Sequence, residues 1–306
     1  MTFSYKTKKE LCKFEDLDLN QLKAEAYGFL LFIKKFSCDE IIMSTENPFV
    51  ADRFSYLLSS IWQVITEKKT TLTGKKNSSH LFTVTVPLKS DCNIIFKDLG
   101  HSEKDISLRV NRANFYCDES MSYFLRGVFL SCGNISDPEK EYHLEFSISY
   151  KNLCDDLCKI IFEVDVLNFL MKTLIRKGNY MAYVKDSEKI SDFLAYIEAP
   201  IASMDIIGAK VIKNMRNNLN RKVNFEVANM DKTLSASLDQ ITAINIIKDK
   251  IGISGLPDEL QELAVLRLEK VDYSLKKLGE KLTPPISKSG VNHRMKKILE
   301  IAKELK

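Results

Sequence analysis

Two similar stretches of sequence decide the fold of this chain: AEAYGFLLFIKKFSC at residues 24–38 and SYFLRGVFLSCGNI at residues 122–135. Each is an apolar run of helical character that contains one glycine, Gly28 in the first and Gly127 in the second. Because a residue without a side chain lets two helix backbones approach closely, we expect the two helices to pack together as a seam between two halves. Two ordinary packed helices are the alternative that spacing alone leaves open.

The segments that follow each glycine repeat in the same order. A strand-like segment comes first, then a helical segment and a further strand, and a closing helix follows the second copy. The expected elements are strands 40–44, 81–88, 142–149 and 180–185 and helices 48–66, 153–163 and 187–197. The pattern predicts an α+β fold in which residues 1–110 and 111–212 form the two repeats of one pseudo-symmetric domain.

The composition is typical of a soluble globular protein with two domains or three. Of the 306 residues, 45% are hydrophobic and 28% are charged. No window of about 20 residues is apolar throughout, and the first residues lack an apolar core of signal-peptide length. We therefore expect a cytoplasmic protein without a membrane partner.

The cysteines and histidines do not form a metal-binding pattern. Seven cysteines are scattered along the chain without a CxxC pair, and the four histidines lie far apart. We expect reduced cysteines, no disulfide framework, no metal site and no cofactor.

The net charge of +4 is unevenly distributed along the chain. Residues 271–306 contain nine basic and four acidic side chains, and residues 208–232 contain six and two, so the remaining residues are acidic on balance. A positive region in the last third of the chain is what a polyanion such as nucleic acid would require. A solvated basic face is the alternative.

Residues 213–233 differ in amino-acid composition from the segments on either side. Asparagines alternate with basic residues here, which favours caps, turns and polar contacts over a continuous core. We interpret this segment as a connector, either helical or extended. Its candidate nucleic-acid contacts are Arg216, Asn220, Arg221 and Asn224, and the alternative is that they only fix the angle between the domains.

Residues 234–306 are expected to form an all-α domain that ends in two amphipathic segments. The expected helices are 234–249, 258–268, 273–282 and 287–305. The last two flank Pro284 and Pro285, which end a helix because proline has no amide donor and disfavours a helical residue before it. Ser287 is placed to cap the next helix. Two short helices, a sharp turn and a cap predict a helix-turn-helix at residues 273–306.

The outer face of the final helix has side chains suited to DNA. Asparagine can bond adenine through two hydrogen bonds and lysine can bond guanine, whereas other basic and hydroxyl groups contact phosphates. The expected base-reading residues are Lys288, Ser289, Asn292, His293 and Lys296. The expected backbone-contacting residues are Lys276, Lys277, Ser287, Arg294 and Lys297. A lysine-rich helix that merely faces water is the alternative.

Three stretches of the chain resemble the WhiA family of regulators from Gram-positive bacteria. They are RGVFLSCGNISDPEKEYHLEF (126–146), MRNNLNRKVNFEVANMDKT (215–233) and SLKKLGEKLTPPISKSGVNHRMKKILEIA (274–302). The resemblance implies an N-terminal domain similar to a LAGLIDADG homing endonuclease with two motif copies. It also implies a C-terminal domain similar to region four of a primary sigma factor.

The same resemblance raises the question of nuclease activity. In that endonuclease fold, an acidic residue near the end of each motif helix holds the metal ion that activates water. Aligning Gly28 and Gly127 with the motif glycine places Ile33 and Cys132 at the acidic positions. Neither side chain offers the oxygen that Mg²⁺ requires. The resemblance therefore implies that the architecture is kept and the chemistry lost.

The function expected from these observations is that of a non-enzymatic, sequence-specific protein that binds double-stranded DNA and regulates transcription. The family resemblance associates it with cell division, chromosome segregation and sporulation. It also implies a nucleoid location and, as candidate partners, a transcription factor or RNA polymerase. The alternatives are an active nuclease that uses Asp39 and Asp137, and an RNA-binding or protein-interaction module.

Overall fold

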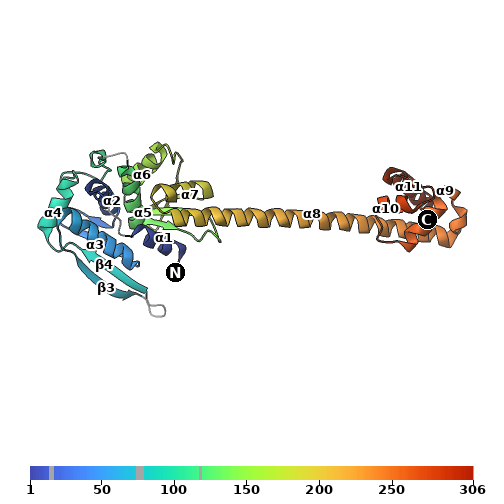
Figure 1. The fold of residues 1–306 in the computed structure, drawn as a ribbon, viewed down its shortest axis with the longest axis horizontal. Helices are drawn as coiled ribbons and strands as arrows, with labels where there is room; N and C mark the ends of the chain where they lie inside the picture. The colour runs from blue at the N-terminus through green and yellow to red at the C-terminus, as the bar shows by residue number, and fades with distance from the viewer. Residues whose placement is uncertain (14–16, 74–78, 117–118, 306) are drawn as a thin grey trace. The chain divides into compact units, whose positions relative to one another are not determined.

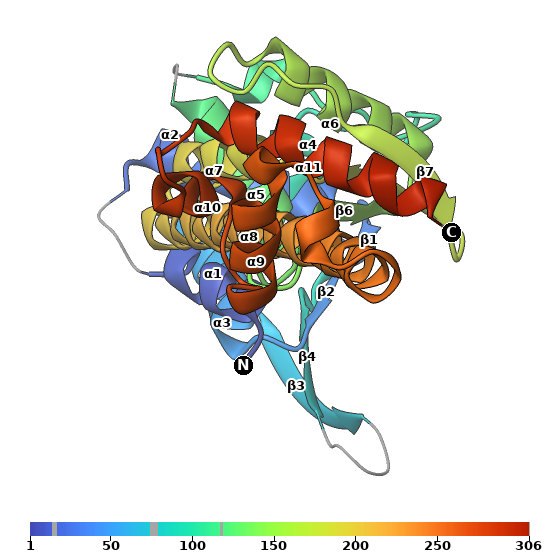
Figure 2. The same cartoon turned by 90° about the vertical axis from the view of Figure 1, so that its right-hand side faces the viewer.

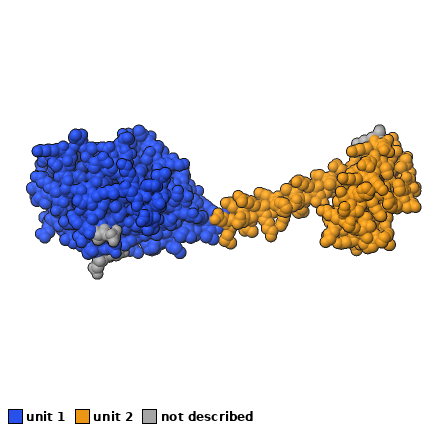
Figure 3. Space-filling view, turned by 90° about the horizontal axis from the view of Figure 1, so that it is seen from above, with its two compact units in different colours: residues 1–213 blue, residues 214–306 orange. Residues whose placement is uncertain are grey.

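The computed structural model describes residues 1–13, 17–73, 79–116 and 119–305 (Figure 1). The chain divides into two compact units, Met1–Lys213 and Asn214–Lys306 (Figure 3). Cys117 lies outside the described residues, and the six described cysteines are all free thiols. None of the described helices combines the length and the apolar character needed to cross a membrane.

The first unit contains two copies of the same arrangement of helices and strands. The first copy consists of α2 (Leu19–Leu31), β1 (Lys35–Phe36), β2 (Ile41–Thr45), α3 (Pro48–Trp62), β3 (Glu67–Thr73), β4 (Ser79–Thr85) and α4 (Lys89–Asp98). The second consists of α5 (Ser120–Cys132), β5 (Gly133–Ile135), β6 (Leu144–Ile148), α6 (Lys151–Glu163), β7 (Lys172–Arg176), β8 (Asn179–Val184) and α7 (Ser187–Tyr196). A helix α1 (Phe3–Leu11) precedes both copies, and a 3-10 turn (Arg112–Asn114) lies between them.

Each copy contains one antiparallel four-stranded sheet, and the two sheets have the same strand order. The orders are β1-β2-β4-β3 and β5-β6-β8-β7. This repetition confirms the predicted pseudo-symmetric α+β fold. The predicted helix–strand–helix–strand unit was incomplete, however, because β1, β3, β5 and β7 were missed. The strands β1 and β5 are too short to show a pattern, and β7 is exposed at every position, so it lacks an alternating apolar face.

The helices α2 and α5 cross at the centre of the unit, at their two glycines. A Cβ atom added to Gly28 would lie 2.0 Å from the Phe124 carbonyl oxygen. One added to Gly127 would lie 2.1 Å from the Glu25 carbonyl oxygen. These contacts are between backbones, so the prediction of a glycine seam is confirmed. Phe29, Leu30, Phe124 and Phe129 are fully buried around it.

The seam also holds a buried group of charges that bridges several helices. The Glu25 carboxylate on α2 accepts a hydrogen bond of 2.9 Å from Arg53 Nε on α3. The Arg126 guanidinium on α5 lies 3.8 Å from Glu25 and 2.9 Å from Glu198. Because an unpaired charge is costly in the interior, this network requires the helices to keep one relative register.

The second unit consists of the later part of α8 (Pro200–Lys250) and of α9 (Asp258–Glu269), α10 (Leu275–Lys281) and α11 (Lys288–Glu304). A 3-10 turn (Ile253–Gly255) joins α8 to α9. The prediction of a separate helix at 234–249 was wrong, because α8 runs without a break through the connector and this segment. No proline or glycine interrupts it between residues 209 and 250, and the connector is therefore helical.

The three short helices pack around the last turns of α8 (Figure 2). The apolar faces of the two predicted amphipathic segments form part of the core of this unit. The fully or largely buried side chains include Ile244, Ile247, Leu263, Leu278, Leu282, Val291, Met295 and Ile298. The buried Arg267 of α9 donates to Gln240 Oε1 (2.9 Å) on α8 and to the Tyr273 carbonyl (2.7 Å) before α10. This side chain thereby fixes the loop between α9 and α10 against α8.

Candidate nucleic-acid interface

Two serine caps define where α10 and α11 begin. The backbone N–H of Lys277 donates to Ser274 Oγ (3.4 Å), and the backbone N–H of Gly290 donates to Ser287 Oγ (3.2 Å). Each hydroxyl therefore satisfies an amide that has no partner within its helix. The predicted cap at Ser287 is confirmed, and the cap at Ser274 was not predicted.

The turn between α10 and α11 folds back tightly on α10. The backbone N–H of Ile286 donates to the Gly279 carbonyl oxygen (3.0 Å). A Cβ atom at Gly279 would lie only 2.3 Å from the Ile286 carbonyl oxygen, so only glycine leaves room for this turn. The turn sets the direction in which α11 leaves the helix pair.

The five expected base-reading residues share one exposed face of α11. Lys288, Ser289, Asn292, His293 and Lys296 are exposed, whereas Val291, Met295 and Ile298 on the opposite face are buried in the core. They occupy the first three turns after the cap. This placement leaves their side chains open to a ligand that approaches the N-terminal part of α11.

The expected backbone-contacting residues occupy more varied environments. Lys276 and Lys277 are exposed on α10, and Arg294 is half-buried. The Ser287 hydroxyl is already bonded as a cap. Lys297 Nζ lies 3.0 Å from Glu259 Oε1 on α9, and the lysine holds the pKa of that carboxyl below its usual value. A phosphate at Lys297 would therefore compete with Glu259.

The two glycine-bearing helices of the first unit do not end in acidic side chains at their C-terminal ends, where the motif would place them. Ile33 lies just beyond the end of α2 and is buried. Cys132 is the last residue of α5, and burial raises the pKa of its thiol to about 12. Among the described residues, no group of three or more histidine, cysteine, aspartate or glutamate side chains is arranged to hold a metal ion.

Two family models and several relatives match this chain. The model of the WhiA LAGLIDADG-like domain matches residues 121–216, and the model of the WhiA C-terminal HTH domain matches residues 219–302. A "Probable cell division protein WhiA" from Clostridium acetobutylicum is 35% identical over 320 aligned residues, which cover 100% of this chain and 99% of that protein. The chain belongs to the WhiA family. A relative of the same name from Ruminiclostridium cellulolyticum is 38% identical and covers 100% of this chain and 98% of the relative.

A solved WhiA structure agrees with the fold. The full-length DUF199/WhiA from Thermatoga maritima has a TM-score of 0.58 and is 24% identical in sequence, and the match covers 99% of each chain. The LAGLIDADG-like repeats and the C-terminal helix-turn-helix are thus features that this WhiA chain shares with its family.

A lysine that the sequence did not point to lies at the end of the seam in this WhiA chain. Lys8 Nζ of α1 donates to the Leu130 carbonyl oxygen (3.0 Å) near the end of α5 and lies 5.7 Å from the centre of the Phe129 ring. Burial lowers the pKa of Lys8 to about 8, although the nearby Cys132 acts in the opposite direction. Because α1 lies outside both repeats, no sequence pattern connects Lys8 with the seam.

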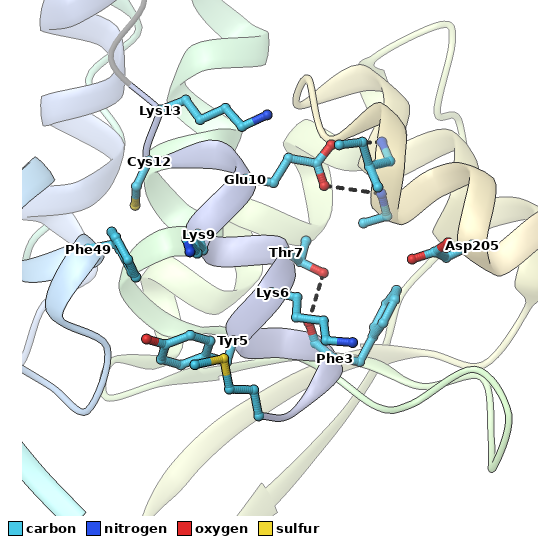
Figure 4. Close-up of a pocket in the computed structure, with 13 residues that line it drawn as sticks. Phe3, Tyr5, Lys6, Thr7, Lys9, Glu10, Cys12, Lys13, Phe49 and Asp205 are labelled. Atoms are coloured by element: carbon cyan, nitrogen blue, oxygen red, sulfur yellow. Dashed lines mark hydrogen bonds between the residues drawn. The ribbon is translucent and has the colours of Figure 1, made fainter.

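The last turn of α1, the helix that carries Lys8, is held against the start of α8 by Glu10. The Glu10 carboxylate accepts hydrogen bonds from the backbone N–H groups of Ile201 (2.7 Å) and Ala202 (3.1 Å) at the start of α8 (Figure 4). A carboxylate is stabilised at a helix N-terminus by the free amides and by the helix dipole. Glu10 therefore holds α1, and with it Lys8, in place.

The four candidate contacts in the connector are all exposed on α8. Arg216, Asn220 and Asn224 are four residues apart and lie on one face of the helix, and Arg221 lies further around it. These residues lie in the interior of α8, far from its two ends, so their side chains do not take part in a helix cap or a turn. The expectation that asparagines here would cap helices is not met within residues 214–233.

Proposed function

We propose that this WhiA-family chain is a non-enzymatic, sequence-specific DNA-binding protein that regulates transcription through its helix-turn-helix. The observation that carries the proposal is the exposed polar face of α11, where Asn292 and four neighbours stand opposite a fully buried apolar stripe. An α-helix with such a face fits the major groove of DNA, where base edges present distinct donors and acceptors.

The charge distribution supports duplex DNA as the ligand. Residues 271–306 contain nine basic and four acidic side chains, and most of the basic ones are exposed on α10 and α11. Binding to phosphates releases counterions, so the affinity depends steeply on salt. In our proposal, Lys276 and Lys277 contact phosphates, while Lys288, Ser289, Asn292, His293 and Lys296 contact base edges.

A salt series of fluorescence anisotropy tests where the chain binds DNA. We expect log K of the full chain on mixed duplex DNA to fall linearly with log salt, and binding to RNA of equal length to be weaker. Replacing Lys276 and Lys277 with alanine should lower the slope by about two, because each phosphate contact contributes about 0.9.

The matched control removes the same charge from the other unit. Lys97 and Lys104 are exposed in the first unit, and their replacement by alanine should leave the slope unchanged. Equal slopes for both double variants would contradict phosphate binding by the helix-turn-helix. Equal affinity for RNA and duplex DNA would favour the alternative of an RNA-binding module.

The absence of nuclease activity is the second part of the proposal. Ile33 and Cys132 stand where the family fold would need carboxylates, and the Lys8 amine lies where its positive charge would repel a metal ion. Asp39 is engaged with Lys89 at 3.5 Å, and the Asp137 carboxylate accepts a hydrogen bond from the Glu139 backbone N–H (2.9 Å). Asp137 thus has a local role in its turn, and Asp39 pairs with a lysine at the start of α4.

We expect supercoiled DNA incubated with the full chain and Mg²⁺ to show no more nicking than DNA without protein. The readout is the fraction of open-circular DNA on a gel, with a known nicking enzyme as the positive control. Nicking that disappears in Asp39→Ala or Asp137→Ala, but not in the matched exposed variant Asp105→Ala, would contradict the proposal and favour an active nuclease.

The names of the relatives support a proposed cellular role. The relatives are named as cell division proteins. We propose that this chain acts in the cytoplasm on nucleoid DNA and controls genes for cell division, chromosome segregation and sporulation. In this proposal a partner transcription factor or RNA polymerase acts with it at its promoters.

A further inference from the structure

The helix α8 has an apolar stripe that no described part of the chain covers. Met215, Leu219, Val223, Val227, Met230 and Leu234 are each half exposed or more. They recur at intervals of three and four residues, which places them on one face of the helix. We call these six side chains the α8 stripe. A continuous apolar strip of this kind on a surface usually marks a contact with another molecule.

The same segment of α8 has little else to stabilise it as a helix. Asparagine is a weak helix former, and residues 214–229 contain six of them. Within the described chain, no ion pair involves a side chain of residues 214–236; Thr233 Oγ1 bonds to the Asn229 carbonyl (2.9 Å). Helices in proteins gain most of their stability by burying an amphipathic face, so a helical segment of this composition requires a partner for its stripe.

The positions of the stripe are nearly symmetric about residue 225. Val223 and Val227 lie on either side of this centre, Leu219 and Met230 lie further out, and Met215 and Leu234 lie at the two ends. Reading the stripe in either direction therefore gives almost the same spacing. A second copy running in the opposite direction would meet an apolar residue at each of these levels.

The charges beside the stripe favour the antiparallel direction. Residues 214–224 contain Arg216 and Lys222 beside the stripe, Arg221 on the opposite face, and no acidic residue. Residues 225–236 contain Glu226 and Asp231 beside the stripe and one lysine, Lys232, on the opposite face. An antiparallel pair places the basic half of one copy against the acidic half of the other, whereas a parallel pair places like charges together.

We propose that the α8 stripe is a homodimer interface, in which two copies of this chain pair through residues 215–234 as antiparallel helices related by a two-fold axis near residue 225. In this arrangement Met215 packs on Leu234 of the partner subunit, and Leu219 packs on Met230 of the partner subunit. Such a contact is isologous, so it closes as a dimer. It has few residues per copy compared with a standard interface, as is typical of a weak, reversible contact.

Sedimentation equilibrium of the full chain over a range of micromolar concentrations tests the dimer. The wild type is expected to shift from monomer to dimer mass as its concentration rises, whereas Leu219→Glu and Met230→Glu remain monomeric. Phe225→Glu is the matched control, because Phe225 is also highly exposed on α8 but lies off the stripe. This variant is expected to dimerise like the wild type.

Charge reversal tests the direction of pairing. Arg216→Asp is expected to weaken the dimer, and adding Asp231→Arg is expected to restore it, because these two residues face each other only between antiparallel copies. Far-UV circular dichroism at a dilution where every variant is monomeric checks that all retain the folded core of the second unit. A wild type that stays monomeric throughout, equal dissociation by Phe225→Glu, or no rescue by Asp231→Arg would each overturn the proposal.

Discussion

Gly127→Ala is expected to destabilise the first unit by about 3 kcal/mol or more, the largest effect on folding that we predict for one methyl group. The added Cβ would lie 2.1 Å from the Glu25 carbonyl oxygen and 2.7 Å from the Phe29 nitrogen. Both are backbone atoms, so no side-chain rotation can relieve the clash, and α2 and α5 must move apart. Their separation would also disturb the buried pair of Glu25 and Arg53, whose charges are costly to leave unpaired.

Urea unfolding followed by tryptophan fluorescence measures this effect. The single tryptophan, Trp62, lies at the end of α3 in the first unit, where its Nε1 donates to Asp98 Oδ2 (2.9 Å). The unfolding midpoint should shift to lower urea in Gly127→Ala with an unchanged slope.

Gly208→Ala is the matched control, because it makes the same substitution within a helix. A Cβ atom at Gly208 would have no other atom within 4 Å. Alanine is the better helix former, so this variant should be as stable as the wild type or more stable by about 0.5–1 kcal/mol. A Gly127→Ala variant as stable as the wild type would contradict the close approach of α2 and α5.

Asn292→Ala is expected to reduce the affinity for the preferred DNA site by about 1–3 kcal/mol, while leaving binding to unrelated duplexes nearly unchanged. Asn292 is exposed on the outer face of α11, one turn after the Ser287 cap. The side-chain amide of an asparagine there can form two hydrogen bonds with the edge of a base, one through its N–H and one through its oxygen. Alanine forms neither, so the donor and acceptor on that base edge would lose their partners. Lys288→Ala should have an effect of similar size on the preferred site.

Competition anisotropy on a site selected from random duplexes measures this loss. Asn245→Ala, at an exposed asparagine on α8, is the control for the substitution itself and should bind as the wild type does. Lys276→Ala should weaken all duplexes similarly, because phosphate contacts do not depend on sequence. Lys297→Ala should have a smaller effect, since Glu259 already pairs with that ammonium. Equal losses on all sequences for Asn292→Ala would exclude a base-reading role.

Much of the fold could be predicted because the relevant signals are local. Three local features indicated where helices begin and end. They are the two glycine-bearing runs, the prolines at 284 and 285, and the apolar positions from Val291 to Ile298. Apolar periodicity and turn chemistry therefore indicated most helices of both units and the cap at Ser287, but not α1 or α4. The strands β3 and β7 were missed because their pairing depends on a neighbouring strand, and their own side chains show no buried alternation.

By itself, the sequence determined the two-repeat α+β domain, the helix-turn-helix and the absence of acids at the C-terminal ends of the motif helices. These features depend on residue type and spacing along the chain. Only the tertiary structure placed the Lys8 amine beside the Leu130 carbonyl, paired Lys297 with Glu259, and ran α8 through the connector. These outcomes depend on groups that are distant in sequence, or on packing that overrides the weak preferences of single residues such as asparagine.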